Sequence, residues 1–371
     1  MKALGLAGLG RVGLRSLKIL TRYMRGLELI VFDRDPSRLE LLRDFENTRF
    51  IPVKDVNEIA RHLSEIDLLM IALPSREAYK LLRSAASRCV DIIDVSYQQS
   101  DPYDLERTFL DCGRIYIPDA GYAPGYSNLL AGYAQNTVES LESLEIYVGG
   151  IPSRNIPPIG YTITWSAEDL LEEYMRPAKI VRDGSIIEVD PLEQIGFIEI
   201  EGLGSLEWFY SDGLHTMLRN IKARNMFEAT LRWPGHIETF RILKNLGFLD
   251  RERISIGGEE IEIYRITAEI LERRLRINAE DIAILLVRAR GSQGLYEEFI
   301  MMRGKPEDPA TTRFTSIVFA STTLLVARER SRFRSGVHPL EDLYTYKDYF
   351  ERMLLENQPE KDLISIVKRR I

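Results

Sequence analysis

Short apolar runs alternate with amphipathic stretches from residue 2 to about residue 118. The apolar runs predict buried strands, and the 3.6-residue periodicity between them predicts helices, as in Val12–Met24. The predicted strands are Ala3–Ala7, Glu28–Phe32, Phe50–Val53, Asp67–Ala72, Asp91–Val95 and Arg114–Ile117. This alternation is typical of a parallel sheet with helices on both faces, so an α/β, doubly wound domain is expected over residues 1–120.

The pattern changes after a turn-rich segment at residues 118–128. Strand-like alternation interrupted by turns predicts an α+β domain with a mostly antiparallel sheet and helices on one face, over residues 121–310. Its predicted strands are Glu145–Val148, Tyr161–Trp165, Ile186–Val189, Gly196–Glu201, Glu260–Ile266 and Ile282–Ala289. A helical segment, residues 311–371, is expected to return to the first domain through an apolar helix at Ser316–Val326.

Length and charge narrow the class of protein. A chain of 371 residues is long enough for two cores, and its net charge of −7 argues against a nucleic-acid partner. The first residues read as a strand rather than a signal peptide, which predicts a cytoplasmic protein. The run Thr315–Ala327 is shorter than the roughly 20 residues of a membrane helix, so we expect a buried helix and no membrane partner.

The two cysteines, Cys89 and Cys112, form neither a Cys-x-x-Cys pair nor a cluster with histidine at metal-ligand spacing. We therefore expect reduced thiols and no metal site.

A glycine motif at Gly8-Leu9-Gly10-Arg11-Val12-Gly13 follows the first predicted strand and opens the first predicted helix. Gly8 permits a tight turn, Gly10 lets a pyrophosphate approach the backbone, and Gly13 allows close helix packing. Strand, helix and spacing agree on a Rossmann dinucleotide site, with the helix amides facing the phosphates.

An acidic residue, Asp33, ends the second predicted strand and would accept hydrogen bonds from the ribose hydroxyls, which favours NAD. The neighbouring Arg34 leaves NADP possible, since an arginine there can face a 2′-phosphate. The loops after the fourth and fifth strands are expected to border the nicotinamide. They contribute Leu73, Pro74, Val95 and Ser96.

Polar clusters in the turn-rich segment and the second domain carry a family resemblance. They are Asp119-Ala-Gly-Tyr-Ala-Pro-Gly125, Gly149-Gly-Ile-Pro152, Thr164-Trp-Ser166, Tyr210-Ser-Asp-Gly-Leu214, Thr230-Leu-Arg-Trp-Pro-Gly-His236 and Ser335-Gly-Val-His-Pro-Leu-Glu341. With them the sequence resembles the saccharopine dehydrogenase and lysine 6-dehydrogenase family. The saccharopine reductase branch has an acid just before Pro124-Gly125, whereas Ala123 stands here, which makes the sequence more similar to the lysine 6-dehydrogenase branch.

The resemblance implies a substrate pocket facing the nicotinamide. Its implied members are Asp119, His236 and Tyr97 as catalytic groups and Arg232, Trp165, Tyr122 and Asp212 as substrate-binding groups. It also implies a homodimer through the sheet of the second domain.

Each implied role has an alternative in ordinary protein chemistry. Arg232 suits the substrate carboxylate, but it could be paired inside the domain. His236 could move a proton or be a buried structural group. Asp119 could hold the substrate ammonium or cap a turn, and Tyr97 could donate a proton or line the nicotinamide pocket.

The expected activity is NAD(P)-dependent oxidation at a C–N bond, first of all deamination of L-lysine at its ε-amine, as the resemblance implies. Saccharopine, which needs further cationic groups such as Arg176 and Arg224, is one alternative substrate, and a polyamine precursor such as carboxynorspermidine is another. A dinucleotide-binding sensor without turnover is the alternative outside enzymes.

Overall fold

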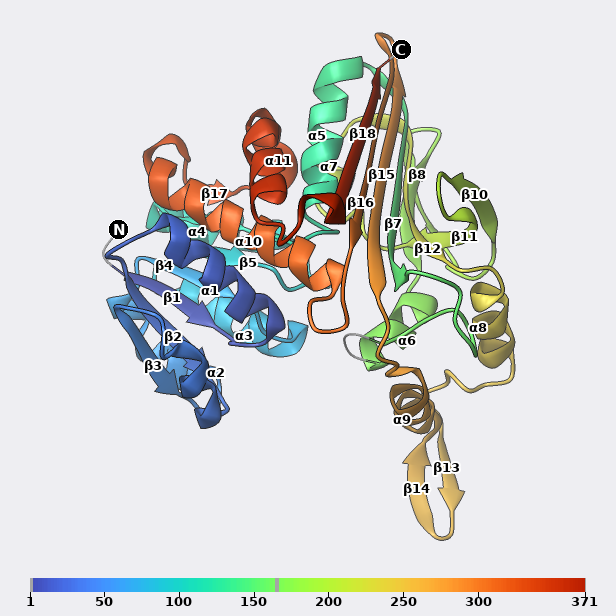
Figure 1. The fold of residues 1–371 in the computed structure, drawn as a ribbon, viewed down its shortest axis with the longest axis horizontal. Coiled ribbons are helices and arrows are strands. Elements are labelled where there is room, and N and C mark those ends of the chain that lie inside the picture. The colour runs from blue at the N-terminus through green and yellow to red at the C-terminus, as the bar shows by residue number, and fades with distance from the viewer. Residues whose placement is uncertain (1–2, 164–166, 371) are drawn as a thin grey trace. The chain divides into compact units, whose positions relative to one another are not determined.

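The computed structural model describes residues 3–163 and 167–370 (Figure 1). The chain forms two compact units, residues 1–133 with 312–361 and residues 134–311 with 362–371. The expected boundary after residue 120 thus precedes helix α5 (Tyr126–Val138), whereas the first unit ends inside this helix. Helix α5 is mostly buried, and it continues from one unit into the other.

A seven-stranded sheet in the order β17-β6-β5-β4-β1-β2-β3 forms the centre of the first unit, and all its pairings are parallel. Its strands are β1 (Ala3–Ala7), β2 (Glu28–Asp33), β3 (Thr48–Pro52), β4 (Leu68–Ile71), β5 (Asp91–Asp94), β6 (Ile115–Ile117) and β17 (Gly336–Val337). The predicted doubly wound sheet is confirmed. The strand order reverses between β1 and β4, which is where such folds bind their ligands.

Helices cover both faces of this sheet. One face packs against helices α2 (Val56–Ala60), α3 (Ser75–Ala86) and α4 (Glu106–Cys112). The other carries α1 (Arg11–Tyr23) and α10 (Ala310–Glu329), which lie side by side in Figure 1. Ser16 Oγ on α1 donates to the Ser316 carbonyl on α10 at 3.1 Å. Helix α11 (Lys347–Glu356) and the 3-10 helices η1 (Pro36–Leu42), η2 (Leu63–Glu65), η3 (Pro102–Leu105), η4 (Arg330–Arg332) and η5 (Leu340–Tyr346) complete the unit.

Helix α10 lies in the apolar core of the unit. By length and composition it is apolar enough to cross a membrane, but 78% of its most apolar window is buried inside the protein, as in the core helices of many proteins. Its hydroxyls are satisfied within the helix, since Ser321, Thr322 and Thr323 each donate to the carbonyl four residues earlier.

A second sheet, in the order β10-β11-β12-β7-β15-β16-β18 with β8 and β9 attached to β12, forms the centre of the second unit. Its strands are β7 (Leu141–Pro152), β8 (Ala178–Arg182), β9 (Ser185–Val189), β10 (Gly196–Ile200), β11 (Gly204–Ser211), β12 (Ala223–Arg232), β15 (Asp281–Gly291), β16 (Gly294–Arg303) and β18 (Ile364–Arg370). The sheet is antiparallel except between β12 and β7, so the predicted mostly antiparallel sheet is confirmed.

Shorter elements complete the second unit. Its helices are α6 (Ala167–Met175), α7 (Met217–Asn220), α8 (His236–Asn245) and α9 (Ile263–Leu275), and a hairpin is formed by β13 (Arg253–Ile256) and β14 (Glu259–Glu262). The short η6 (Lys361–Leu363) precedes β18.

Three predicted elements differ from the structure. The strand expected at Glu260–Ile266 is half hairpin and half helix, because α9 begins at Ile263. Residues 161–163 are not a strand. Residues 364–370 are not helical: they form β18, which pairs with β16.

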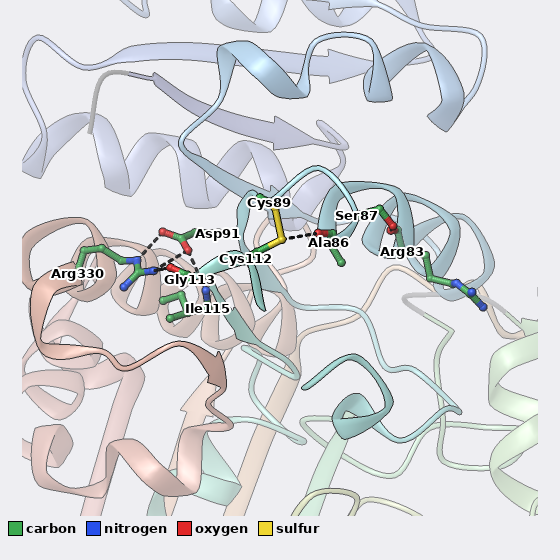
Figure 2. Close-up of a disulfide and its surroundings, with 9 residues drawn as sticks. All are labelled: Arg83, Ala86, Ser87, Cys89, Asp91, Cys112, Gly113, Ile115 and Arg330. Atoms are coloured by element: carbon green, nitrogen blue, oxygen red, sulfur yellow. Dashed lines mark hydrogen bonds and ion pairs between the residues drawn. A yellow bond between two sulfur atoms is a disulfide. The ribbon is translucent and has the colours of Figure 1, made fainter. Parts of the chain in front are cut away.

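The two cysteines form a disulfide, so the expectation of reduced thiols is wrong (Figure 2). Cys89 lies just before β5, and Cys112 ends α4, three residues before β6 begins. Because β5 and β6 are neighbours in the sheet, their entry points bring the two Cα atoms to 5.2 Å despite 23 residues of separation. This distance is ordinary for a disulfide. Groups of acidic, cysteine and histidine side chains suited to a metal are absent from the described residues.

Candidate functional site

The glycine loop between β1 and α1 uses its three glycines in different ways. Gly8 has φ of +97°, and a Cβ there would lie 2.3 Å from the Ala72 carbonyl oxygen. A Cβ on Gly13 would lie 2.0 Å from the Gly8 carbonyl oxygen, so both positions are required by the fold. A Cβ on Gly10 would meet nothing within 4 Å. The fold alone does not require Gly10, whereas a ligand lying against the loop would.

The amino end of α1 is open to an anion. Gly10 precedes the helix, and no side chain caps its first amides. Arg11 is exposed and Val12 is partly exposed at this end. Free amides at a helix N-terminus, next to a glycine without a side chain, can hold a pyrophosphate.

Asp33 lies at the end of β2 and is bonded into the glycine loop. Its Oδ2 accepts a hydrogen bond from the Leu9 amide at 2.7 Å, and its Oδ1 accepts one from the Asp35 amide at 3.0 Å. Arg34 is exposed. Sequence reasoning missed Arg38, whose Nη1 donates to the Leu9 carbonyl at 3.0 Å. Both an acid and a guanidinium therefore lie at the place expected for the adenosine ribose.

The loops after β4 and β5 are tied together at the same edge of the sheet. Ser96 Oγ donates to the Leu73 carbonyl at 2.8 Å, and the Val95 amide donates to the Ile71 carbonyl at 3.1 Å. Pro74 is exposed just before α3 begins. These loops lie where a nicotinamide binds in folds of this kind.

Two acids lie beside each other at the ends of β5 and β6. The Ala120 amide donates to the Asp94 carbonyl oxygen at 2.8 Å, which joins the residue after Asp119 to the end of β5. Burial raises the pKa of Asp94 to about 7, and the nearby Asp119 adds to the rise. Sequence reasoning named Asp119 but missed Asp94, although an acid at the end of a buried strand is the signal that identified Asp33.

The turn after Asp119 is closely packed. Asp119 has φ of +51°, and its carbonyl accepts the Gly121 amide at 2.7 Å. The Ala123-Pro124 peptide bond is cis, and a Cβ on Gly125 would lie 2.1 Å from the Gly121 carbonyl oxygen. The Tyr122 ring is buried against Phe314, with ring centroids 4.7 Å apart. The turn thus presents Asp119 on a fixed backbone.

Arg232, at the end of β12, is bound inside the second unit. Its Nη2 donates to Glu173 Oε2 at 2.7 Å, and its guanidinium lies over the Tyr161 ring, 4.7 Å from the centroid. The side chain is 3% exposed. This contact supports the alternative of an arginine paired inside the domain.

His236, the first residue of α8, is fully buried. Its Nδ1 is 2.9 Å from the Ile159 carbonyl oxygen, and its Nε2 is 2.7 Å from the Tyr174 hydroxyl. Burial, with Arg232 nearby, lowers the pKa of His236 to about 3. A neutral imidazole whose two nitrogens are both engaged supports the structural alternative over proton transfer.

The remaining predicted residues lie in different places. Tyr97 is half-buried in the loop after β5, beside Ser96 in sequence. Asp212, just after β11, accepts a hydrogen bond from the Lys179 amide at 3.3 Å. Trp165 lies outside the described residues. The first unit therefore collects the glycine loop, Asp33, Ser96, Tyr97 and Asp119, while Arg232 and His236 share one network in the second.

Arg232→Ala is expected to lower the free energy of unfolding by about 3 kcal/mol, because the Glu173 carboxylate and Tyr174 hydroxyl lose their buried cation. The matched control is Arg224→Ala on the same strand, whose side chain is 64% exposed and pairs with Asp183. That variant should lose less than about 1 kcal/mol. Urea denaturation measures both. Equal losses would contradict the buried-pair assignment.

Comparisons with known proteins identify the second part of the chain. A family model described as the saccharopine dehydrogenase C-terminal domain matches residues 121–357. A saccharopine dehydrogenase [NADP(+), L-glutamate-forming] from Schizosaccharomyces pombe is 25% identical over 296 residues, covering 73% of this chain and 64% of that protein. An alpha-aminoadipic semialdehyde synthase from Arabidopsis thaliana is 22% identical over 299 residues, covering 76% of this chain and 27% of that protein.

The fold has a counterpart among solved structures. The apo, histidine-tagged saccharopine dehydrogenase (L-Glu forming) from Saccharomyces cerevisiae superimposes with a TM-score of 0.78 at 17% identity, over 100% of both chains. At this identity the likeness concerns the fold alone. The family model, in contrast, matches more than half of the chain. The chain therefore belongs to the saccharopine dehydrogenase family.

Proposed function

We propose that the protein is a dinucleotide-dependent oxidoreductase that acts on a C–N bond of an amino acid. The observation that carries the proposal is Gly10, a glycine that the protein's own packing does not require, at the open end of α1. Asp33 lies beside it, and residues 121–357 match the saccharopine dehydrogenase C-terminal domain. A sensor without turnover would need the dinucleotide loop but not the acids at the ends of β5 and β6.

Oxidation of an amine requires its neutral form, since an ammonium has no lone pair to assist hydride departure. For an amine with a pKa near 10.4, deprotonation at pH 7 costs about 5 kcal/mol unless the site lowers that pKa. Asp119 is the group we assign to take this proton, because its fixed backbone and its place at the sheet edge suit it to face the amine. The bound dinucleotide would accept the hydride.

We propose a secondary amine of the saccharopine type as the first substrate class. The matched relatives that carry saccharopine dehydrogenase in their names support it. Water would then hydrolyse the imine formed by oxidation, giving a carbonyl compound and a primary amine. L-Lysine is the second candidate, since Ala123 stands before the cis Pro124 where the saccharopine reductase branch has an acid.

A substrate screen tests the proposal. Saccharopine, L-lysine and carboxynorspermidine would each be incubated with NAD or NADP, and the absorbance of the reduced cofactor would be followed. Turnover of saccharopine is expected. Turnover of L-lysine alone would move the assignment to the second candidate, and no turnover with tight cofactor binding would identify a sensor.

We further propose that the protein uses NAD in preference to NADP by about tenfold or more in kcat/KM, because the Asp33 carboxylate would repel a 2′-phosphate. Asp33→Asn keeps an oxygen for the Leu9 amide but removes the charge, so it should reduce the ratio of kcat/KM for NAD to that for NADP. Asp35→Asn, which removes an exposed carboxylate two residues later, is the control. If the wild type instead favours NADP, Arg34 and Arg38 would be the residues that bind the 2′-phosphate.

We also propose a homodimer through the second sheet. Aromatic side chains at this sheet, Trp208 and Phe227, are only partly buried, and their rings stack with centroids 5.7 Å apart. Partly exposed aromatic pairs of this kind are frequent in protein interfaces. Light scattering of wild type and Phe227→Glu tests the proposal, since the charged variant should be monomeric.

A further inference from the structure

Strand β5 has a buried aspartate at each of its ends. Asp91, at the first residue, is 4% exposed, and Asp94, at the last, is fully buried. Asp91 is neutralised by an arginine: Arg330 Nε lies 2.5 Å from its Oδ2, and the Ile115 amide donates to its Oδ1 at 2.8 Å (Figure 2). This acid has an ordinary structural role, joining β5 to residues far along the chain.

Asp94 has different surroundings. Its Oδ1 accepts the Ser96 amide at 2.8 Å, and its Oδ2 accepts the Gln98 side-chain amide at 3.0 Å. These partners are neutral, and another acid, Asp119, adds to the rise of the Asp94 pKa. Burying a carboxylate without a cation is costly, and an asparagine could satisfy the same loop. The loop alone therefore does not explain why an acid stands here.

A third polar group faces the two acids. Tyr116, on β6, is fully buried, and its hydroxyl has no hydrogen-bond partner among the described residues. Burial raises the pKa of Tyr116, and both Asp94 and Asp119 raise it further, so the phenol stays protonated beside them. Tyr116 pairs with Ile92 across the sheet, which places it on the same face as Asp94.

We propose that Asp94 is a positioning residue that holds a proton beside Asp119, with Tyr116 as the second group of this site. Two adjacent carboxyl groups do not both ionise readily, and the one that is fully buried without a cation keeps the proton. Asp119 is then the member of the pair that takes a proton from the substrate amine. The role of Asp119 toward the substrate amine rests on the proposed function, whereas the protonation of Asp94 does not.

The positioning role belongs to the protonated form of Asp94, which is lost as the pH rises through about 7. The kcat/KM of the wild type is therefore expected to fall through an inflection near pH 7. Asp94→Asn should remove the inflection and lower kcat more than it raises KM. Asp91→Asn, a buried acid on the same strand, is the control: it should lower the melting temperature and keep the inflection.

Infrared spectroscopy tests the proton without any turnover. The wild type should show the carbonyl stretch of a protonated carboxylic acid, which disappears as the pH rises through about 7. The component of this band that titrates near pH 7 should be missing in Asp94→Asn and present in Asp91→Asn. Asp342, whose burial raises its pKa to about 6, contributes a separate component in all three proteins. Because the folded pKa of Asp94 lies above its ordinary value, its contribution to stability is present at acidic pH and is lost as the pH rises through about 7. As the pH rises from the ordinary pKa of an aspartate to about 7, the melting temperature of the wild type should therefore fall relative to that of Asp94→Asn.

Tyr116→Phe provides a variant that keeps both acids. It removes a hydroxyl that has no hydrogen-bond partner within residues 3–163 and 167–370, so it should fold normally and shift the midpoint of the band and of the inflection. A component near pH 7 that persists in Asp94→Asn, or that neither variant changes, would overturn the inference. A band that behaves as expected in a protein that oxidises no substrate would overturn the proposed function and leave the protonated Asp94 standing.

Discussion

Gly10→Val is expected to weaken dinucleotide binding about a hundredfold, or by roughly 3 kcal/mol, while the protein folds as before. A side chain at Gly10 meets no protein atom, and its backbone, with φ of −70° and ψ of −169°, is allowed for valine. The added methyl groups would instead occupy the space that a pyrophosphate needs at the open end of α1. Calorimetric titration with NAD and a thermal melt without NAD measure the two effects.

Gly13→Ala is the matched control in the same loop. Its new methyl group would lie 2.0 Å from the Gly8 carbonyl oxygen, which is backbone and cannot move aside easily. This variant should therefore melt at a lower temperature even without a cofactor. Unchanged NAD affinity in Gly10→Val would remove the loop from the cofactor site.

Removing the disulfide is expected to lower the free energy of unfolding by about 3 kcal/mol, because the bond closes a loop of moderate length and restricts the unfolded chain. The double variant Cys89→Ser, Cys112→Ser should show this loss in urea denaturation. The cysteines lie where β5 and β6 begin, whereas the candidate groups follow the ends of these strands. The kcat/KM measured at 25 °C should therefore stay within about twofold of wild type.

The wild type in reducing agent is the companion measurement, and it should unfold at the same urea concentration as the double variant. Alkylation of the unfolded, unreduced protein should leave both cysteines unmodified. Alkylation of two thiols would show instead that Cys89 and Cys112 are reduced, as expected from the sequence. The wild type and the double variant should then be equally stable.

The first unit could be predicted from the sequence because its parallel strands are buried on both faces. Strands such as Leu68–Ile71 are wholly apolar, and each is followed by the turn or acid that marks the edge of the sheet. The glycine loop was equally visible, since its glycines and Asp33 are fixed by local geometry. Asp94 is likewise an acid at the end of a buried strand, but in the sequence pattern it is only one residue within the apolar strand.

The second unit was harder because its strands bury charged residues. Glu207 on β11, Glu228 on β12 and Glu298 on β16 are buried, which interrupts the expected alternation of apolar and polar positions. Contacts between residues that are distant in the sequence were also not predictable. The Glu207 carboxylate accepts a hydrogen bond from the Gly235 amide, and the Tyr174 hydroxyl bonds to His236, 62 residues away in the sequence. Nothing in the local pattern around His236 reveals that neighbour.

Both units are assembled from segments that lie far apart in the sequence, and this order matters while the chain is being synthesised. The first unit needs α10 to cover one face of its sheet, and the second needs β15 and β16 beside β7. When residue 133 has been made, the glycine loop and six of the seven strands of this sheet exist, but the helix that covers one face lies about 180 residues further along the chain. The sheet face that α10 covers therefore lacks this helix until Glu329 has been made, so we expect the first unit to complete its fold late in synthesis.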